Sequence, residues 1–175
     1  MGAAMLSAVT YLADPADPDA IDRLADTLGV LVSGVAAGLV GDAVIVAPGE
    51  TAAVETVAEA TGAALVPFVG GNPFVLGAAR ARRDWILCLE AGDMPGDGWI
   101  RTLDRFVGMA RPETGLGRMR RAAPLGLRLA AGLEEYLGAR TVRAGDVVRR
   151  EILLGNPGSA GRLRVRPLNG RIDRS

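Results

Sequence analysis

Short apolar runs alternate with helical patterns along the first half of the chain. Four runs rich in Val, Leu, Ile and Ala predict buried strands, at residues 5–11, 43–47, 63–69 and 85–89. Apolar residues at helical spacing predict the intervening helices, at residues 19–32, 51–61 and 74–82. Because helical crossovers join the strands, we expect them to be parallel. This alternation predicts a three-layer α/β/α domain with a mainly parallel sheet.

Two further features belong to the first half of the chain. A Gly-rich loop is expected at residues 33–41, and Pro67 suggests an edge position or a strand end for the third strand.

The second half of the chain has a less regular pattern. Further helices are expected at residues 100–109, 123–137 and 145–153, the last beginning at Asp146. The helix over 123–137 carries leucines four residues apart, Leu125, Leu129, Leu133 and Leu137. Residues 111–121 are expected to be irregular, with short strands at 140–143 and 162–166.

Composition excludes several classes of chemistry. All 20 basic residues are Arg, and the chain contains neither Lys nor His. A Ser-His-Asp triad, a His-ligated zinc site and a Walker-A lysine are therefore excluded. Cys88 is the single cysteine and falls within an expected strand, so we expect a buried side chain and a cytoplasmic, reducing compartment. The N-terminus lacks a signal-peptide pattern, and no apolar run reaches the ~20 residues of a membrane-spanning helix.

Charge is unevenly distributed although the net charge is zero. Residues 1–77 carry nine acids and one Arg, whereas residues 78–175 carry eleven acids and nineteen Arg. The basic half would pair with the acidic half, or attract a diphosphate or an anionic membrane surface. Nucleic acid is not expected as a partner, because no aromatic platform accompanies the arginines. A peripheral position at the inner membrane face is compatible with this distribution.

An acidic loop, Glu90 to Asp93, follows the expected strand at residues 85–89. Ligands of open α/β sheets bind just beyond the carboxyl ends of the strands. Acids at such an edge can hold a divalent metal or a ribose. The alternative is a solvated turn without a ligand.

The stretch Leu76 to Trp99, LGAARARRDWILCLEAGDMPGDGW, resembles the centre of family 2 glycosyltransferases of the GT-A fold. In that family an alanine-rich helix leads into a strand that ends in Leu-Asp-Ala-Asp-Asp, and a Pro and a Gly-Trp follow. Glu90 takes the place of the first Asp, Gly92 of the second and Asp93 of the third. The resemblance covers roughly residues 5–110 and implies a GT-A-like, Rossmann-like fold.

The resemblance also implies a function and a cofactor. The family's acids bind a nucleotide diphosphate through a divalent metal, so Glu90 and Asp93 become candidate ligands of Mn²⁺ or Mg²⁺. The expected activity is transfer of a sugar from a nucleotide-diphosphate sugar to an acceptor hydroxyl. The whole chain would be one domain, with a nucleotide-binding-type half (1–110) and a short basic C-terminal extension (111–175).

Three further residues are candidates for nucleotide binding by the same resemblance. Asn72 precedes a helix that approaches the nucleotide in the family, and Arg80 would meet the diphosphate. Glu50 would replace the family's base-reading acids, whose places are taken by Ala47 and Pro48. Alternatively, Glu50 is an ordinary partner of a helix dipole.

Two other functions remain open. A degenerate, non-catalytic scaffold that acts as a binding or assembly partner would account for the missing acids. A nucleotidyltransferase is less well supported, because residues 12–19 lack a Gly-rich loop that ends in Arg. No catalytic base is assigned by the sequence; Glu134 and Glu135 are paired acids on an expected helix. The donor sugar and the acceptor are not specified.

Overall fold

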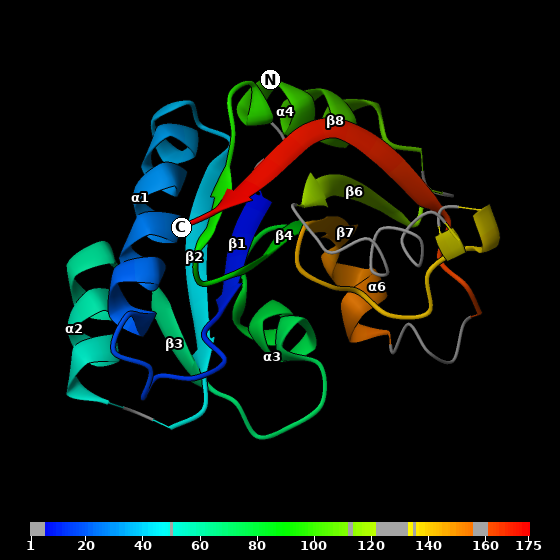
Figure 1. Ribbon diagram of the computed structural model, residues 1–175. Helices are drawn as coiled ribbons and strands as arrows, with labels where there is room; N and C mark the ends of the chain where they lie inside the picture. Colours follow the sequence, from blue (N-terminus) through cyan, green and yellow to red (C-terminus); the bar gives the residue numbers. More distant parts are fainter. Residues whose placement is uncertain (1–5, 50, 112–113, 122–132, 135, 156–160) are drawn as a thin grey trace.

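A computed structural model describes residues 6–49, 51–111, 114–121, 133–134, 136–155 and 161–175 (Figure 1). The strands are β1 (Leu6–Tyr11), β2 (Val40–Ala47), β3 (Ala64–Pro67), β4 (Trp85–Glu90), β5 (Asp93–Pro95), β6 (Leu116–Arg121), β7 (Asp146–Arg149) and β8 (Val165–Arg174). The helices are α1 (Ala20–Ala36), α2 (Ala52–Thr61), α3 (Pro73–Arg80), α4 (Trp99–Met109) and α6 (Arg150–Leu154). The predicted alternation of strands and helices up to β4 is confirmed.

The described strands form one sheet in the order β3-β2-β1-β4-β7-β6-β8-β5. Strands β3, β2, β1 and β4 are parallel to one another. β7 runs antiparallel to β4 and β6, and β8 is parallel to β6. β5 pairs antiparallel with β8. The carboxyl ends of β1, β4, β6 and β8 therefore share one edge of the sheet.

Helices cover both faces of the sheet (Figure 1), which confirms the predicted α/β/α layering. On one face, α1, α2 and α4 bury a cluster that includes Leu24 and Leu103. On the other face, α3 and α6 contribute Phe74 and Leu153 to a second cluster. Both clusters draw on β1 and β4, because successive strand residues point to opposite faces. A strand that is buried on both sides reads as a continuous apolar run.

Two of the helices, α2 and α3, begin at residues whose side chains cap them. The Thr51 hydroxyl accepts the N–H of Val54 at 3.4 Å and so caps α2. Asn72 caps α3, and Pro73 occupies its first turn, where a missing N–H has no cost. α3 ends at Arg80, two residues before the predicted end.

The predicted loop at residues 33–41 is wrong at both ends, because α1 continues to Ala36 and β2 begins at Val40. Gly34 is a helical residue that faces the ring of Trp99. A Cβ atom at position 34 would collide with that ring. The glycine therefore allows α1 and α4 to approach closely and does not mark a loop.

The predictions for residues 111–175 are wrong more often than those for the strands and helices up to β4. Residues 116–121, predicted to be irregular, form β6 inside the sheet. Residues 140–143 are not a strand, and the predicted helix at 145–153 is β7 followed by the short α6. The predicted strand at 162–166 overlaps only the start of β8, which spans ten residues. These segments are rich in charged residues, which the sequence pattern alone assigns to exposed positions. Some of these residues are nevertheless buried, because they pair with residues far away in the sequence.

Most of the predicted helix at 123–137 lies outside the described residues, including Leu125 and Leu129. Leu133 and Leu137 are described and exposed, so a core role for these two is not supported. The C-terminal half, predicted as an extension, supplies β6, β7 and β8 to the same sheet as β1 to β4. Within the described residues, no helix combines the length and apolar character needed to cross a membrane.

Candidate functional site

Glu90 and Asp93 lie together at the carboxyl edge of the sheet. Glu90 is the last residue of β4, and Asp93 is the first residue of β5. The Asp93 carboxylate folds back and accepts the backbone N–H of Glu90 through Oδ2 at 2.8 Å. The structure thus brings the two predicted metal ligands together, although their role as ligands stays a prediction.

The turn between these acids is fixed to α1. The N–H of Gly92 is directed at the hydroxyl of Thr27 (2.9 Å) and the carbonyl of Arg23 (3.0 Å). Gly92 has a φ of +95°, which a side-chain-bearing residue rarely adopts. A Cβ atom here would also lie 3.2 Å from Cδ of Arg23. The local backbone conformation at position 92 therefore favours glycine.

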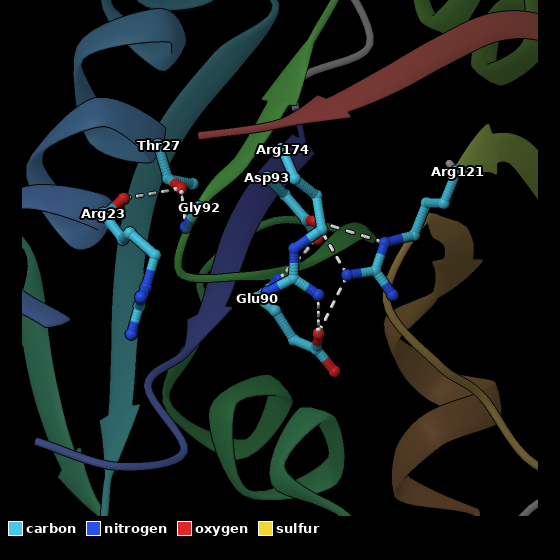
Figure 2. A network of polar contacts seen from close by, with 7 residues as sticks. All are labelled: Arg23, Thr27, Glu90, Gly92, Asp93, Arg121 and Arg174. Atoms are coloured by element: carbon cyan, nitrogen blue, oxygen red, sulfur yellow. Dashed lines mark hydrogen bonds and ion pairs between the residues drawn. The ribbon is translucent and has the colours of Figure 1, made fainter. Parts of the chain in front are cut away.

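Two arginines from later strands close the site (Figure 2). Arg121, at the end of β6, contacts Asp93 Oδ1 through Nη2 at 2.7 Å and through Nε at 3.2 Å. The same Nη2 lies 2.8 Å from Glu90 Oε2. Arg174, at the end of β8, reaches Glu90 Oε2 at 3.4 Å. We name Glu90, Asp93, Arg121 and Arg174 the edge cluster.

Burial and charge oppose each other within the edge cluster. The Asp93 side chain is fully buried, and loss of hydration raises its pKa although the Glu90 N–H and Arg121 favour the charged form. Burial disfavours the charged form of Arg121 as well, but the carboxylates of Asp93 and Glu90 outweigh it and raise the pKa of the guanidinium. Arg121 therefore stays charged, and Asp93 depends on it for its ionised form.

The edge cluster does not fit a divalent metal in the observed arrangement. Mg²⁺ requires about six oxygen ligands near 2.0–2.1 Å in octahedral geometry. Here both oxygens of Asp93 already accept hydrogen bonds, and Arg121 Nη2 lies between the two carboxylates. In the part of the chain that the structure describes, no group of three or more acidic, Cys or His side chains is placed to hold a metal ion.

The other predicted nucleotide-binding residues are dispersed. Glu50 lies outside the described residues. Asn72 caps α3: its Oδ1 accepts the N–H of Phe74 at 2.9 Å, and its Nδ2 donates to the carbonyl of Val142 at 2.9 Å. Arg80 lies at the opposite end of α3, beside a hollow near the start of β2. The structure therefore separates Arg80 from the edge cluster.

A second buried polar network lies between β6 and β7. Arg118 binds Asp146 with two hydrogen bonds, of 2.6 Å and 2.9 Å, and donates to Glu134 at 2.6 Å. Arg143 also pairs with Glu134. Burial raises the pKa of Asp146 despite the neighbouring Arg118. Asp146 was predicted to start a helix, but it holds a buried arginine in the sheet instead. Glu135 lies outside the described residues.

An aromatic pair borders the edge cluster. Tyr11 is opposite Glu90 in the register of β1 and β4, so the two side chains share one face of the sheet. The ring of Tyr11 lies 5.1 Å from the ring of Phe68, measured between centroids. Both side chains are half-buried. The edge thus combines charged groups with a partly exposed apolar surface.

Sequence reasoning missed Arg121 and Arg174. Arg121 belonged to a segment predicted to be irregular, and Arg174 lies beyond the strand predicted at residues 162–166. Their alternation with apolar residues is a weak strand signal, but register alone places them beside Glu90 and Asp93. Cys88 is buried as predicted, and burial raises the pKa of its thiol well above the usual value.

No protein-family model matches the chain, and no curated protein sequence matches it. Solved structures do match. Glucosyl-3-phosphoglycerate synthase from Mycobacterium tuberculosis, in complex with Mn²⁺, UDP-glucose and phosphoglyceric acid, shares 18% identity with a TM-score of 0.54. That alignment covers 85% of this chain and 57% of the synthase. The same synthase with Mg²⁺ and UDP gives 16% identity and a TM-score of 0.55, covering 93% and 68%.

Staphylococcus aureus TarS, residues 1–349, aligns with a TM-score of 0.60 and 11% identity, covering 87% of this chain and 49% of TarS. The chain therefore has the mixed α/β fold of GT-A glycosyltransferases, with a sheet that is mainly parallel. It spans between about half and two thirds of the length of these enzymes.

Proposed function

We propose that this chain is a glycosyltransferase-like protein that binds a nucleotide-diphosphate sugar at the carboxyl edge of its sheet and transfers the sugar to an acceptor hydroxyl. The observation that carries the proposal is the edge cluster, which places two guanidinium groups where α/β folds bind ligands. The motif from Leu76 to Trp99 supports a relation to family 2 glycosyltransferases. The synthase similar in fold is described with UDP-glucose, which supports a nucleotide-sugar donor.

The edge cluster suits the chemistry of a departing diphosphate. Negative charge develops on the leaving group as the glycosidic bond breaks, and fixed cations stabilise it. Guanidinium groups bind phosphate oxygens through paired N–H donors, which fixes the orientation of the donor as well as its charge. Arg121 is held in place by Asp93 and Glu90, so it loses little side-chain freedom when it binds phosphate.

Tyr11 and Phe68 offer the nucleoside an apolar surface beside these cations. Stacking of a base on an aromatic ring contributes about 1–3 kcal/mol. Phe68→Ala should weaken nucleotide binding roughly tenfold, because one ring of the pair is removed. Val69→Ala is the matched control, since Val69 is the next residue and is largely exposed. Equal affinities of both variants for nucleotide would contradict this placement of the base.

A thermal-shift titration with UDP, GDP and their sugar derivatives tests the proposed function. A ligand that binds only the folded protein raises Tm by mass action. We expect one nucleotide series to raise Tm, and Arg174→Ala to reduce that shift. Arg171→Ala serves as control, because Arg171 lies on the same strand with an exposed side chain paired to Asp173. The absence of any shift at millimolar concentration would refute nucleotide binding.

A non-catalytic GT-A scaffold is the second candidate. Three observations favour it. Gly92 has no side chain at the family's second acid position, and Asp93 is fully buried. Ala47, at the end of β2, is likewise buried and apolar where the family has an acid. The same titration separates the candidates, because a scaffold for protein assembly would show no nucleotide-dependent shift. The basic C-terminal half would then be the surface to test against anionic vesicles.

A further inference from the structure

We infer that Arg121 serves as a built-in cation in the place that a divalent metal would need, so that this chain binds its nucleotide diphosphate without metal. The second part of this inference rests on the proposed function. The first part does not, because metal binding is measured on the protein alone. The observations that lead to it are the bridging position of Arg121, the local structure at Gly92, the charge balance of the edge cluster and its remaining donors.

Arg121 bridges the two carboxylates of the edge cluster. Nη2 of Arg121 lies 2.7 Å from Asp93 Oδ1 and 2.8 Å from Glu90 Oε2. Asp93 Oδ2 accepts the N–H of Glu90, so a metal shared by these carboxylates would have to approach Asp93 Oδ1, the oxygen that Arg121 contacts, at about 2.0–2.1 Å. The guanidinium and the metal therefore compete for one position, and the metal binds only if Arg121 leaves.

The local structure at Gly92 removes the third ligand. Its φ of +95° is one that side-chain-bearing residues rarely adopt, and an added Cβ would lie 3.2 Å from Cδ of Arg23, so an acidic side chain is disfavoured here. Its N–H is committed to α1 through Thr27 and Arg23. Its carbonyl accepts the N–H of Ser175 at 3.0 Å. Gly92 therefore offers neither a side chain nor a readily available carbonyl to complete a coordination sphere.

Charge balance also favours the arginine. The two carboxylates face two guanidinium groups, so the edge cluster is neutral when Asp93 is ionised. A bound Mn²⁺ would add two positive charges beside Arg121 and Arg174. Displacing Arg121 would in turn leave its own charge without the buried partner that raises its pKa.

The edge cluster retains donors for an anion. In the described part of the chain, no hydrogen bond is found for Nη1 of Arg121, or for Nε and Nη2 of Arg174. The side chain of Arg174 is 47% exposed. These N–H groups match the oxygens of a diphosphate, whereas Glu90 and Asp93 would repel it if Arg121 were absent.

The first experiment measures Mn²⁺ binding to the purified full chain by electron paramagnetic resonance, without nucleotide. We expect no saturable binding at micromolar Mn²⁺ in the wild type. Saturable binding that disappears in Glu90→Gln would overturn the inference. Arg121→Ser removes the cation that bridges the two carboxylates and should bind Mn²⁺ at least about tenfold more tightly than the wild type. If that variant does not fold, the wild-type and Glu90→Gln measurements still decide the outcome.

The second experiment compares nucleotide affinity in EDTA and in Mn²⁺ by calorimetry, with the nucleotide that raises Tm. We expect Kd to agree within about twofold, since the cation is part of the chain. Arg121→Lys keeps the charge but loses the paired donors, and it should weaken binding about tenfold or more. Arg120→Lys is the control, because Arg120 is exposed on the same strand. A tenfold loss of wild-type affinity in EDTA would overturn the inference.

The two proposals fail in different ways. If no nucleotide binds in either buffer, the proposed function fails, and the Mn²⁺ measurement alone decides whether Arg121 excludes metal. If a nucleotide binds only with Mn²⁺, the proposed function stands and the built-in cation is refuted.

Discussion

At the scale of single residues, the ion pair of Asp93 and Arg121 determines the charge and the stability of the edge cluster. Asp93 has no exposed surface, and its carboxylate is compensated by one guanidinium and one backbone N–H. Removing one partner from a buried pair leaves the other charge without compensation, which costs more than the pair itself contributes. The stability and the proposed function of the site thus depend on the same residue.

Arg121→Ala should lower the free energy of unfolding by about 2–4 kcal/mol, because a buried carboxylate loses its cation. Urea unfolding followed by circular dichroism measures the loss. Arg120→Ala should stay within about 0.5 kcal/mol of the wild type, as exposed substitutions usually do. Similar losses in both variants would show that the pairing with Asp93 contributes nothing specific.

Asn72 allows a structural role to be separated from a binding role. Asn72→Ala removes the cap of α3 and the hydrogen bond to Val142, so we expect a loss of about 1–2 kcal/mol in stability. Asn72→Asp keeps the acceptor for Phe74 and should lose less. Urea unfolding gives both values. A variant that keeps wild-type stability but loses nucleotide affinity would instead support the nucleotide-binding role predicted from the sequence.

At the scale of elements, α3 packs unusually closely against β1 and β2. Gly77 of α3 lies directly over Val9 of β1 and next to Val46 of β2. A Cβ atom at position 77 would overlap Val9 and lie 3.2 Å from Cγ2 of Val46. The helix can sit this close to the sheet only because the residue has no side chain.

Gly77→Ala should therefore destabilise the protein by about 1–3 kcal/mol through overpacking. Gly29→Ala is a matched control in another helix, because nothing lies within 4 Å of the added Cβ. There we expect a gain of about 0.5–1 kcal/mol from helix propensity. Thermal unfolding of both variants checks the signs. A neutral Gly77→Ala would mean that β1 and α3 move apart at little cost.

The elements also show how far the sequence specifies the fold. Strands β1, β2 and β4 are buried on both faces, so their apolar runs predicted them well. β6 reads Leu-Gly-Arg-Met-Arg-Arg, and this basic segment was predicted to be irregular. In the structure, Arg118 of β6 is compensated by Asp146 of β7, 28 residues away. A pattern of polarity cannot reveal a pairing that only the assembled sheet creates.

The same reasoning explains which part of the site could be predicted. Glu90 and Asp93 follow a recognisable strand, so their place at the edge could be inferred from the local sequence. Arg121 and Arg174 reach them only through the register of β6, β8 and β5. The predicted acids were found, but the cations that decide their chemistry were not.

At the scale of the whole molecule, buried carboxyl groups link stability to pH. Burial raises the pKa of Asp93 and of Asp146 above the ordinary value of 3.8. A carboxyl group with a raised pKa in the folded state binds its proton more tightly when folded. Its contribution to stability is therefore greatest below pH 3.8 and is lost as pH rises through the raised value.

Comparison with Asp93→Asn isolates this effect, because asparagine does not titrate. We expect the stability of the wild type relative to the variant to decrease as pH rises from below 3.8, and then to become constant. Urea unfolding at a series of pH values measures the difference. An increase over the same range would show that Arg121 outweighs burial and lowers the pKa of Asp93.

The pairing of β5 with β8 has a consequence for the order of assembly. Glu90 and Arg174 are 84 residues apart in sequence. The backbone N–H of Ser175 donates a hydrogen bond to the carbonyl of Gly92. Contacts of such long sequence separation form late, since a large loop must close first. During synthesis, β1 to β4 can pair on the ribosome while Glu90 and Asp93 still lack their arginines. The nascent chain therefore carries two uncompensated acids at its sheet edge until β6 supplies Arg121, and Glu90 gains its second arginine only when β8 pairs.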